Sequence, residues 1–175
     1  AAKKYGKVWV VAPDGQRSAM SHRITLRETI EFFPVDFPVE GVHAYASTGT
    51  PADCVRFGIL NIVKEKPDYV FSGINYGYNS GTDIQYSATV GSALEAACAG
   101  VHAVAFSEGA SECHEVTDAY LERMMEELME QPLAYNQIWN VNFPSCRPKE
   151  ILYDRFPSAR PCCEMVYTPE VLPDG

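Results

Sequence analysis

Short apolar runs alternate with longer helix-like segments along most of the chain, and this alternation constrains the fold more than any other feature. The run KVWVVA at 7–12 is rich in β-branched residues, which is typical of a strand buried on both faces of a sheet. Strands that alternate with helices of roughly 10 to 16 residues indicate parallel βαβ units. We therefore predict an α/β fold, with a largely parallel sheet and helices on both faces. The other predicted strands are 23–33, 42–47, 67–72, 101–106 and 138–143, and the predicted helices are 51–65, a segment from about Ser87 to Gly100, and 115–130.

The two ends of the sequence differ from its middle. Residues 1–6 resemble a last helical turn, with Lys3 and Lys4 suited to the negative helix end and Gly6 predicted as a left-handed cap. Because a domain seldom opens on the tail of a helix, we expect a strand and a helix upstream of Ala1. Residues 1–150 are predicted to form one domain. Residues 151–175 are predicted to form an extended arm that ends in half of a hairpin.

Charge and cysteine usage exclude several classes of function. The net charge of −9 argues against a sequence-independent binder of nucleic acid or of anionic membranes, which needs a basic face. The six cysteines show no CxxC or Cys/His spacing typical of structural zinc. We expect no signal peptide, and the given sequence contains no apolar run of 18 or more residues. We therefore expect a reduced, cytoplasmic protein.

Small polar residues gather in three loops that follow predicted strands. In an open parallel sheet, ligands bind beyond the carboxyl ends of the strands, in the loops that lead to helices. All three loops carry hydroxyl, amide and Gly groups rather than clusters of His or Cys. They are APDGQRSAMSH at 12–22, STGTPADC at 47–54 and SGINYGYNSGTDIQYSAT at 72–89.

The third loop has the composition of an anion site. Ser87 and Thr89 stand where a helix begins, so the backbone N–H groups there lack intrahelical partners and carry the positive end of the helix dipole. Gly73, Gly77 and Gly81 allow the backbone to approach a ligand or to turn. The same residue types also serve as helix caps and turn formers. Convergence of the three loops at one sheet edge favours the phosphate site.

Other sequence features are weaker evidence for a functional site. GINYGYNSG is not a GxGxxG dinucleotide motif, and neither a GxSxG elbow nor a Walker motif occurs. His22 lies in a polar loop beside Arg17 and is a candidate for contact with a phosphate. The remaining histidines are predicted to be structural, and a loop aspartate such as Asp53 is typical of a cap or a turn.

The three loops resemble those of the SurE family (survival protein E), metal-dependent 5′/3′-nucleotidases that hydrolyse nucleoside monophosphates. The matching segments are VVAPDGQRSAMSHRITL at 10–26, STGTPADCV at 47–55 and PDYVFSGINYGYNSGTDIQYSATVGSALEA at 67–96. With the intervening strands, the resemblance runs from residue 1 to about 145. It implies a Rossmann-like α/β phosphatase domain, with residues 151–175 in a hairpin that makes subunit contacts.

The resemblance also implies a role for individual residues. Ser18 and Asn75 correspond to ligands of the family's divalent cation, Mg²⁺ or Mn²⁺. The family's remaining ligands are an Asp-Asp pair, whose place would lie upstream of Ala1, so the catalytic residues cannot be named within this chain. The residues that correspond to the phosphate and substrate side are Ser87, Thr89, Asn79, Gly49 and Thr50.

The function implied is metal-dependent hydrolysis of nucleoside 5′- or 3′-monophosphates to nucleoside and phosphate, by a homodimer or homotetramer with neither nucleic acid nor membrane as a partner. Two alternatives belong to other classes. One is a phosphate- or nucleotide-binding module without turnover, and the other is an assembly fragment whose loops bind nothing. The sequence does not choose the base, the 5′ or 3′ position or the metal.

Overall fold

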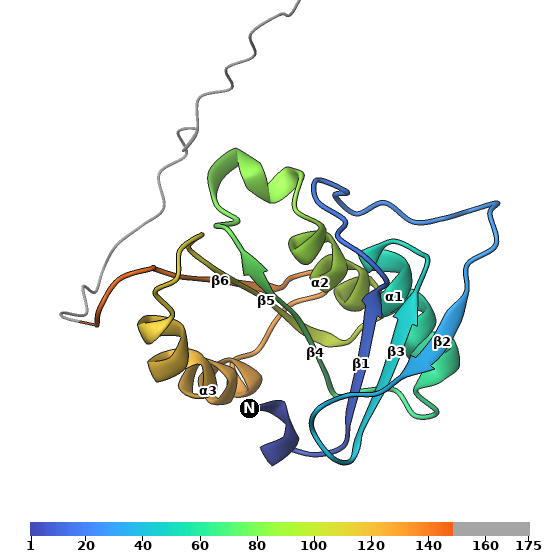
Figure 1. Cartoon of the computed structure of the whole chain (residues 1–175), viewed down its shortest axis with the longest axis horizontal. Coiled ribbons are helices and arrows are strands. Elements are labelled where there is room, and N and C mark those ends of the chain that lie inside the picture. Colours follow the sequence, from blue (N-terminus) through green and yellow to red (C-terminus); the bar gives the residue numbers. More distant parts are fainter. Residues whose placement is uncertain (149–175) are drawn as a thin grey trace, which may run out of the picture.

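The computed structural model describes residues 1–148 (Figure 1). The predicted arm at 151–175 and its subunit-contact hairpin lie outside these residues. Six strands form two three-stranded sheets, in the orders β1-β3-β2 and β4-β5-β6. The strands are β1 (Val8–Pro13), β2 (Phe32–Val35), β3 (Val42–Ser47), β4 (Tyr69–Tyr76), β5 (His102–Glu108) and β6 (Trp139–Phe143).

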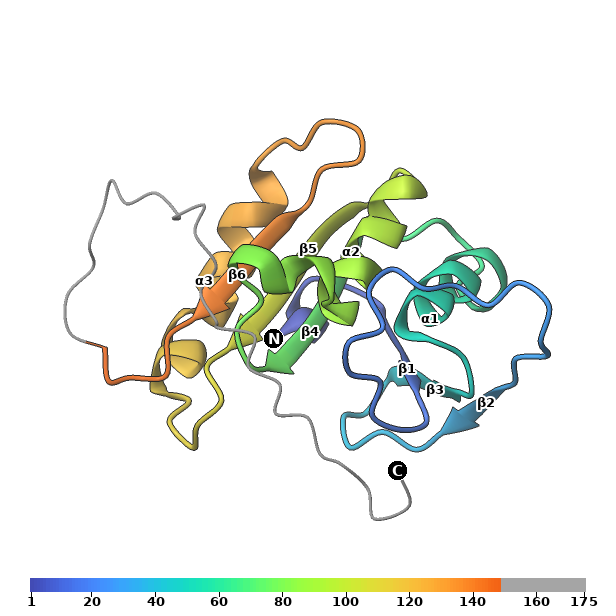
Figure 2. The same ribbon diagram turned by 90° about the horizontal axis from the view of Figure 1, so that it is seen from above.

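Parallel pairing dominates both sheets, as the alternation of strands and helices predicted. β1 pairs with β3, and β5 pairs with both β4 and β6, all in parallel, while β2 runs antiparallel along β3. Seen from above, the strands follow one another from β6 to β2, with β4 and β1 as neighbours in the middle (Figure 2). Each of these two is the end strand of its own sheet. The described residues thus form two sheets rather than one.

Helices cover both faces of β5, and the alternation of its side chains shows why. Ala103 and Ala105 pack against Val90 and Ala93 of helix α2 (Ala88–Cys98). The residues between them, Val104 and Phe106, pack against Val116 and Met125 of helix α3 (Glu115–Glu130). Because successive side chains of a strand point to opposite faces, α2 and α3 lie on opposite sides of the sheet. Helix α1 (Pro51–Phe57) packs beside α2.

Two predicted elements near the first loops are wrong in extent. The strand expected at 23–33 is observed only at Phe32–Val35, and it includes Pro34 rather than ending before it. β2 is an edge strand, where proline removes no hydrogen bond that the sheet interior needs. The helix expected at 51–65 ends as an α-helix at Phe57, followed by a π-helical turn at Gly58–Ile62.

Two other predicted elements end at a different residue in the structure. The strand expected at 67–72 is β4, which runs on to Tyr76 with a register shift between Ser72 and Asn75. Asn75 therefore stands in a strand rather than in the loop. At the start of the chain, the predicted turn is a 3-10 helix at Ala2–Lys4, but its cap is Tyr5. Gly6 has a φ of 158°, far from the left-handed helical value of about +57°.

Two findings bear on the compartment predictions. Within residues 1–148, no helix combines the length and the apolar composition needed to cross a membrane. The four cysteines of the described part of the chain, Cys54, Cys98, Cys113 and Cys146, are free thiols.

Candidate functional site

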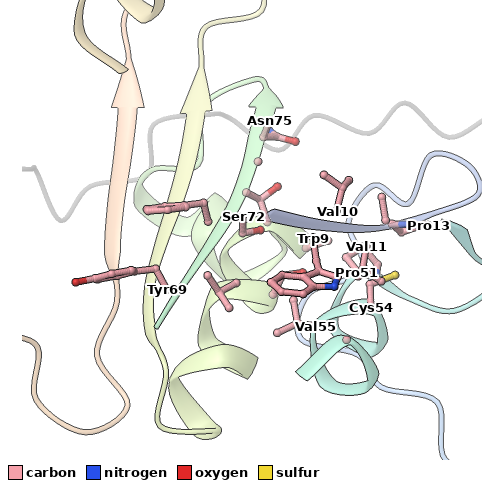
Figure 3. Close-up of a pocket in the computed structure, with 18 of the residues that line it drawn as sticks. Trp9, Val10, Val11, Pro13, Pro51, Cys54, Val55, Tyr69, Ser72 and Asn75 are labelled. Atoms are coloured by element: carbon pink, nitrogen blue, oxygen red, sulfur yellow. The ribbon is translucent and has the colours of Figure 1, made fainter. Parts of the chain in front are cut away.

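A cleft with a volume of about 1160 Å³ lies between β1 and β4 (Figure 3). Its middle is apolar, with Val10 and Val11 on one side, and Val70 and Phe71 on the other. The cleft also reaches the carboxyl ends of both strands and the start of α2, where polar groups gather. Five of the residues predicted from the sequence line it: Ser18, Asn75, Asn79, Ser87 and Thr89.

Gly49 and Thr50 do not line this cleft, although the residue after them, Pro51, does. The Thr50 hydroxyl donates to the carbonyl oxygen of Arg23 at 2.6 Å and accepts from the backbone N–H of Asp53 at 3.1 Å. Thr50 is also buried, with an exposed fraction of 5%. The hydroxyl therefore caps α1 and joins two loops. Its role in substrate binding stays a prediction.

The start of α2 presents backbone donors to the cleft. Ser87 is the N-cap, and its hydroxyl accepts from the N–H of Val90 at 3.1 Å. The first intrahelical bond runs from Gly91 N–H to the Ser87 carbonyl, so the N–H groups of Ala88 and Thr89 precede the helical ladder. Ala88 and Thr89 both line the cleft. Such unused donors, together with the helix dipole, favour an anion at this end of the cleft.

Asn75 and Ser18 approach the cleft from different elements. The side chain of Asn75 extends from the end of β4 toward the side of β1 (Figure 3). Its Nδ2 donates to the Gly77 carbonyl at 2.8 Å, which leaves the amide oxygen facing away from that carbonyl. Ser18 lies in the loop after β1, where its hydroxyl accepts from Gln16 Nε2 at 3.0 Å. Both residues thus bring a neutral oxygen to one cleft.

Asn79 is held by a network that sequence reasoning did not find. Its Nδ2 donates to the Ser107 hydroxyl at 2.6 Å, and its backbone N–H donates to Asn142 Oδ1 at 2.7 Å. Its carbonyl accepts from the side-chain amides of Asn140 and Asn142. Asn140 and Asn142 alternate with apolar residues in β6, which was a signal that one face of that strand is polar. The network fixes the backbone of the third loop at the carboxyl ends of β5 and β6.

The Cys54 thiol of the cleft is not activated as a nucleophile. Burial raises the pKa of the Cys54 thiol to about 12, so it stays protonated at neutral pH. Among the residues of 1–148 that line the cleft, none is a histidine. His22, the candidate for phosphate contact, instead pairs with Glu95, its Nε2 lying 2.7 Å from Glu95 Oε2.

The donor groups fit a divalent cation only in part. The oxygens of Ser18 and Asn75 are hard donors of the type that Mg²⁺ and Mn²⁺ accept, but both are neutral, and these cations favour carboxylates. Within residues 1–148, no group of three or more His, Cys, Asp or Glu side chains is arranged to hold a metal ion. Asp14, in the loop of Ser18, pairs with Arg17 at 2.8 Å. These donors do not make a metal site by themselves.

Comparisons with known proteins give one consistent result. Residues 1–160 match the family described as Survival protein SurE. The chain is 45% identical over 142 residues to the 5′-nucleotidase SurE of Thermoanaerobacter sp. strain X514, covering 79% of this chain and 55% of that relative. It is 41% identical over 152 residues to the 5′-nucleotidase SurE of Clostridium botulinum strain ATCC 19397, covering 85% of this chain and 60% of that relative.

A solved structure shares the fold. The crystal structure of the SurE protein from Aquifex aeolicus matches with a TM-score of 0.71 and 34% identity, covering 83% of this chain and 58% of that one. The chain therefore spans little more than half the length of each of these relatives.

Proposed function

The chain belongs to the survival protein SurE family, and from that premise we propose that it forms part of a phosphomonoesterase that hydrolyses nucleoside 5′- or 3′-monophosphates to nucleoside and phosphate. One observation carries the proposal: the start of α2, with its unused N–H donors, opens into the cleft that Ser18 and Asn75 also line. Two relatives that share at least 41% of their aligned residues with this chain are named 5′-nucleotidases.

In this proposal, the phosphate of the substrate lies at the start of α2. The N–H groups of Ala88 and Thr89 and the Thr89 hydroxyl donate to its oxygens. Ser87 shapes the helix start as the cap rather than as a ligand, since its hydroxyl already accepts from Val90. Fixed donors of this kind stabilise the charge that spreads over the phosphoryl oxygens in the transition state.

We further propose that Mg²⁺ or Mn²⁺ is the cofactor, with Ser18 and Asn75 each giving one neutral oxygen. A bound cation would polarise a phosphoryl oxygen and generate or orient the attacking water. Because both oxygens are uncharged, carboxylates are needed in addition. We also propose the homodimer or homotetramer and the cytoplasmic location predicted from the sequence.

A binding module without turnover is the second candidate, because the described residues lack both a carboxylate cluster and a histidine in the cleft. Such a module would bind phosphate at the same helix start. It differs in its response to metal, since its affinity for nucleotide would be the same with and without a divalent cation.

The deciding experiment is the release of inorganic phosphate by the parent protein that contains this chain, from a panel of nucleoside monophosphates, with Mn²⁺ or Mg²⁺ and with EDTA. We expect metal-dependent release that falls by about 10- to 100-fold in Asn75→Ala, because the cleft loses one of its two neutral ligands. Asn61→Ala, at an exposed position outside the cleft, is the control and should retain the wild-type rate. Metal-independent nucleotide binding without phosphate release would instead establish the binding module.

Tyr86 is expected to contact the nucleoside base. It lines the cleft immediately before the helix cap, and 53% of it is exposed, so one face of the ring can stack on a base. Removing such a ring costs about 1–3 kcal/mol of stacking. Tyr86→Ala should therefore raise KM for nucleoside monophosphates about tenfold, and Tyr86→Phe should not. Glycerol phosphate, which has no base, is the control substrate; an equal rise in its KM would contradict the stacking role.

A further inference from the structure

The buried carboxylate of Glu95 joins the end of the first loop and helix α1 to helix α2. Glu95 lies in the third turn of α2, and only 7% of its side chain is exposed. Its Oε2 lies 2.7 Å from Nε2 of His22, which ends the first loop. Its Oε1 accepts from Nε of Arg56 at 2.6 Å, in the last turn of the helix that the second loop begins. Each oxygen thus holds one partner from a different element.

The segment before His22 lies directly on α2. The backbone N–H of Ser21 donates to the Tyr86 carbonyl at 2.9 Å, and the Ser21 hydroxyl donates to the Gln85 carbonyl at 2.8 Å. A Cβ at Gly91 would lie only 2.3 Å from the Ser21 carbonyl oxygen, which shows how closely the two backbones approach. Ser18 lies three residues before Ser21. The position at which residues 21 and 22 are held against α2 therefore determines the position of Ser18 relative to the start of the helix.

Arg56 and His22 have separable roles at Glu95. Arg56 compensates the charge of the buried carboxylate by itself, whether or not His22 contacts Glu95. The contact with His22 is not needed for that compensation. The contact between His22 and Glu95 instead holds the end of the first loop against the third turn of α2, one turn beyond Gly91.

We propose that Glu95 is a positioning residue, which acts through His22 to hold Ser18 beside Asn75 and the start of α2. The effect on catalysis rests on the proposed function, whereas the position of the loop can be measured without an activity assay. Removing the His22 side chain should loosen the loop and leave the fold intact, because Arg56 still pairs with Glu95.

The first measurement is hydrogen exchange of the amides at 17–23 in the 175-residue chain. We expect His22→Ala to speed their exchange at least about tenfold, and Glu95→Gln to do so to a lesser extent. His22→Gln, whose amide can still donate to Glu95, should restore most of the protection. Glu127→Gln removes an exposed ion pair with Arg123 on α3 and serves as the matched control. Unchanged protection of 17–23 in His22→Ala would overturn the proposal.

The second measurement separates this proposal from the function. In phosphate-release assays of the parent protein, kcat/KM should fall about tenfold in His22→Ala and recover in His22→Gln, in parallel with the protection of the loop. If the wild-type protein releases no phosphate, the proposed function fails while the exchange result still decides the positioning role. A loop that loosens with no change in an active enzyme would overturn the link between His22 and Ser18.

Discussion

Replacing Asp53 with alanine is expected to lower the free energy of unfolding by about 4 kcal/mol. Asp53 is fully buried, and its carboxylate accepts from the N–H and the hydroxyl of Thr25 and from the N–H of Thr50. Alanine would leave one buried donor and two half-buried donors without an acceptor, and a buried unpaired donor costs about 1–3 kcal/mol. The same carboxylate also completes the capping box of α1.

Urea unfolding followed by circular dichroism measures this loss. Asp118→Asn, at an exposed position of α3, is the control and should change stability by less than about 0.5 kcal/mol. Asp53→Asn keeps one acceptor and should fall between the wild type and Asp53→Ala. A loss in Asp53→Ala no larger than in Asp118→Asn would show that the loop of Thr25 is not held by this carboxylate.

The contribution of Asp53 should also depend on pH. Burial acts to raise the pKa of its carboxyl group, but the hydrogen bonds from Thr25 and Thr50 outweigh burial and hold the pKa below its ordinary value of 3.8. A group with a lowered pKa in the folded state stabilises fully above the unfolded pKa and loses that effect as the pH falls through the folded value. The stability gap between wild type and Asp53→Asn should therefore be constant from neutral pH to about pH 5 and shrink below pH 3.8. A gap that persists in acid would contradict this assignment.

Elements whose residues repeat with one clear period were predictable from the sequence. The helix at 115–130 is observed with those bounds, because its apolar residues recur at helical spacing and face β5 and β6. Ser87 is observed as the cap of α2, since a hydroxyl before an apolar stripe is a strong start signal. Local patterns of this kind do not depend on distant parts of the chain.

The errors lie where distant contacts override the local pattern. Pro34 is part of β2 because the strand lies at an edge, and the sequence around it does not reveal that position. β4 continues through Gly73 to Tyr76 because β5 beside it supplies pairing partners for Asn75 and Tyr76. In both cases the neighbouring strand decides where the element ends.

The candidate site also contains both residues that were predictable from the sequence and residues that were not. Five of the predicted site residues line the cleft, and they were predicted from a family resemblance together with the rule that ligands bind at carboxyl strand ends. The groups that hold them were not. Asn142 contacts Asn79 across 63 residues of sequence, and Glu95 contacts His22 across 73. No local period signals a hydrogen bond of that span, so these supporting residues became visible only in the fold.

The second large effect that we expect is a loss of stability in Gly91→Ala, whereas this replacement in a helix usually raises stability. In a helix interior, replacing glycine with alanine ordinarily stabilises by about 1 kcal/mol, because alanine loses less backbone entropy. At Gly91 the new Cβ would lie 2.3 Å from the carbonyl oxygen and 2.7 Å from the carbonyl carbon of Ser21. Both are backbone atoms and cannot turn aside as a flexible side chain would. The first loop must therefore lift away from α2.

Overpacking of this kind costs about 1–3 kcal/mol, and the loop also loses its hydrogen bonds to Tyr86 and Gln85. We expect a net loss of about 3 kcal/mol in urea unfolding, with faster hydrogen exchange at 17–23. Gly58→Ala is the matched control, because its Cβ would meet Val11 at an ordinary 3.5 Å and its φ is −54°. That variant should be neutral or stabilised by up to about 1 kcal/mol. If Gly91→Ala gained stability as Gly58→Ala does, the first loop would not lie on α2, and Ser18 could not be held at the helix start by this contact.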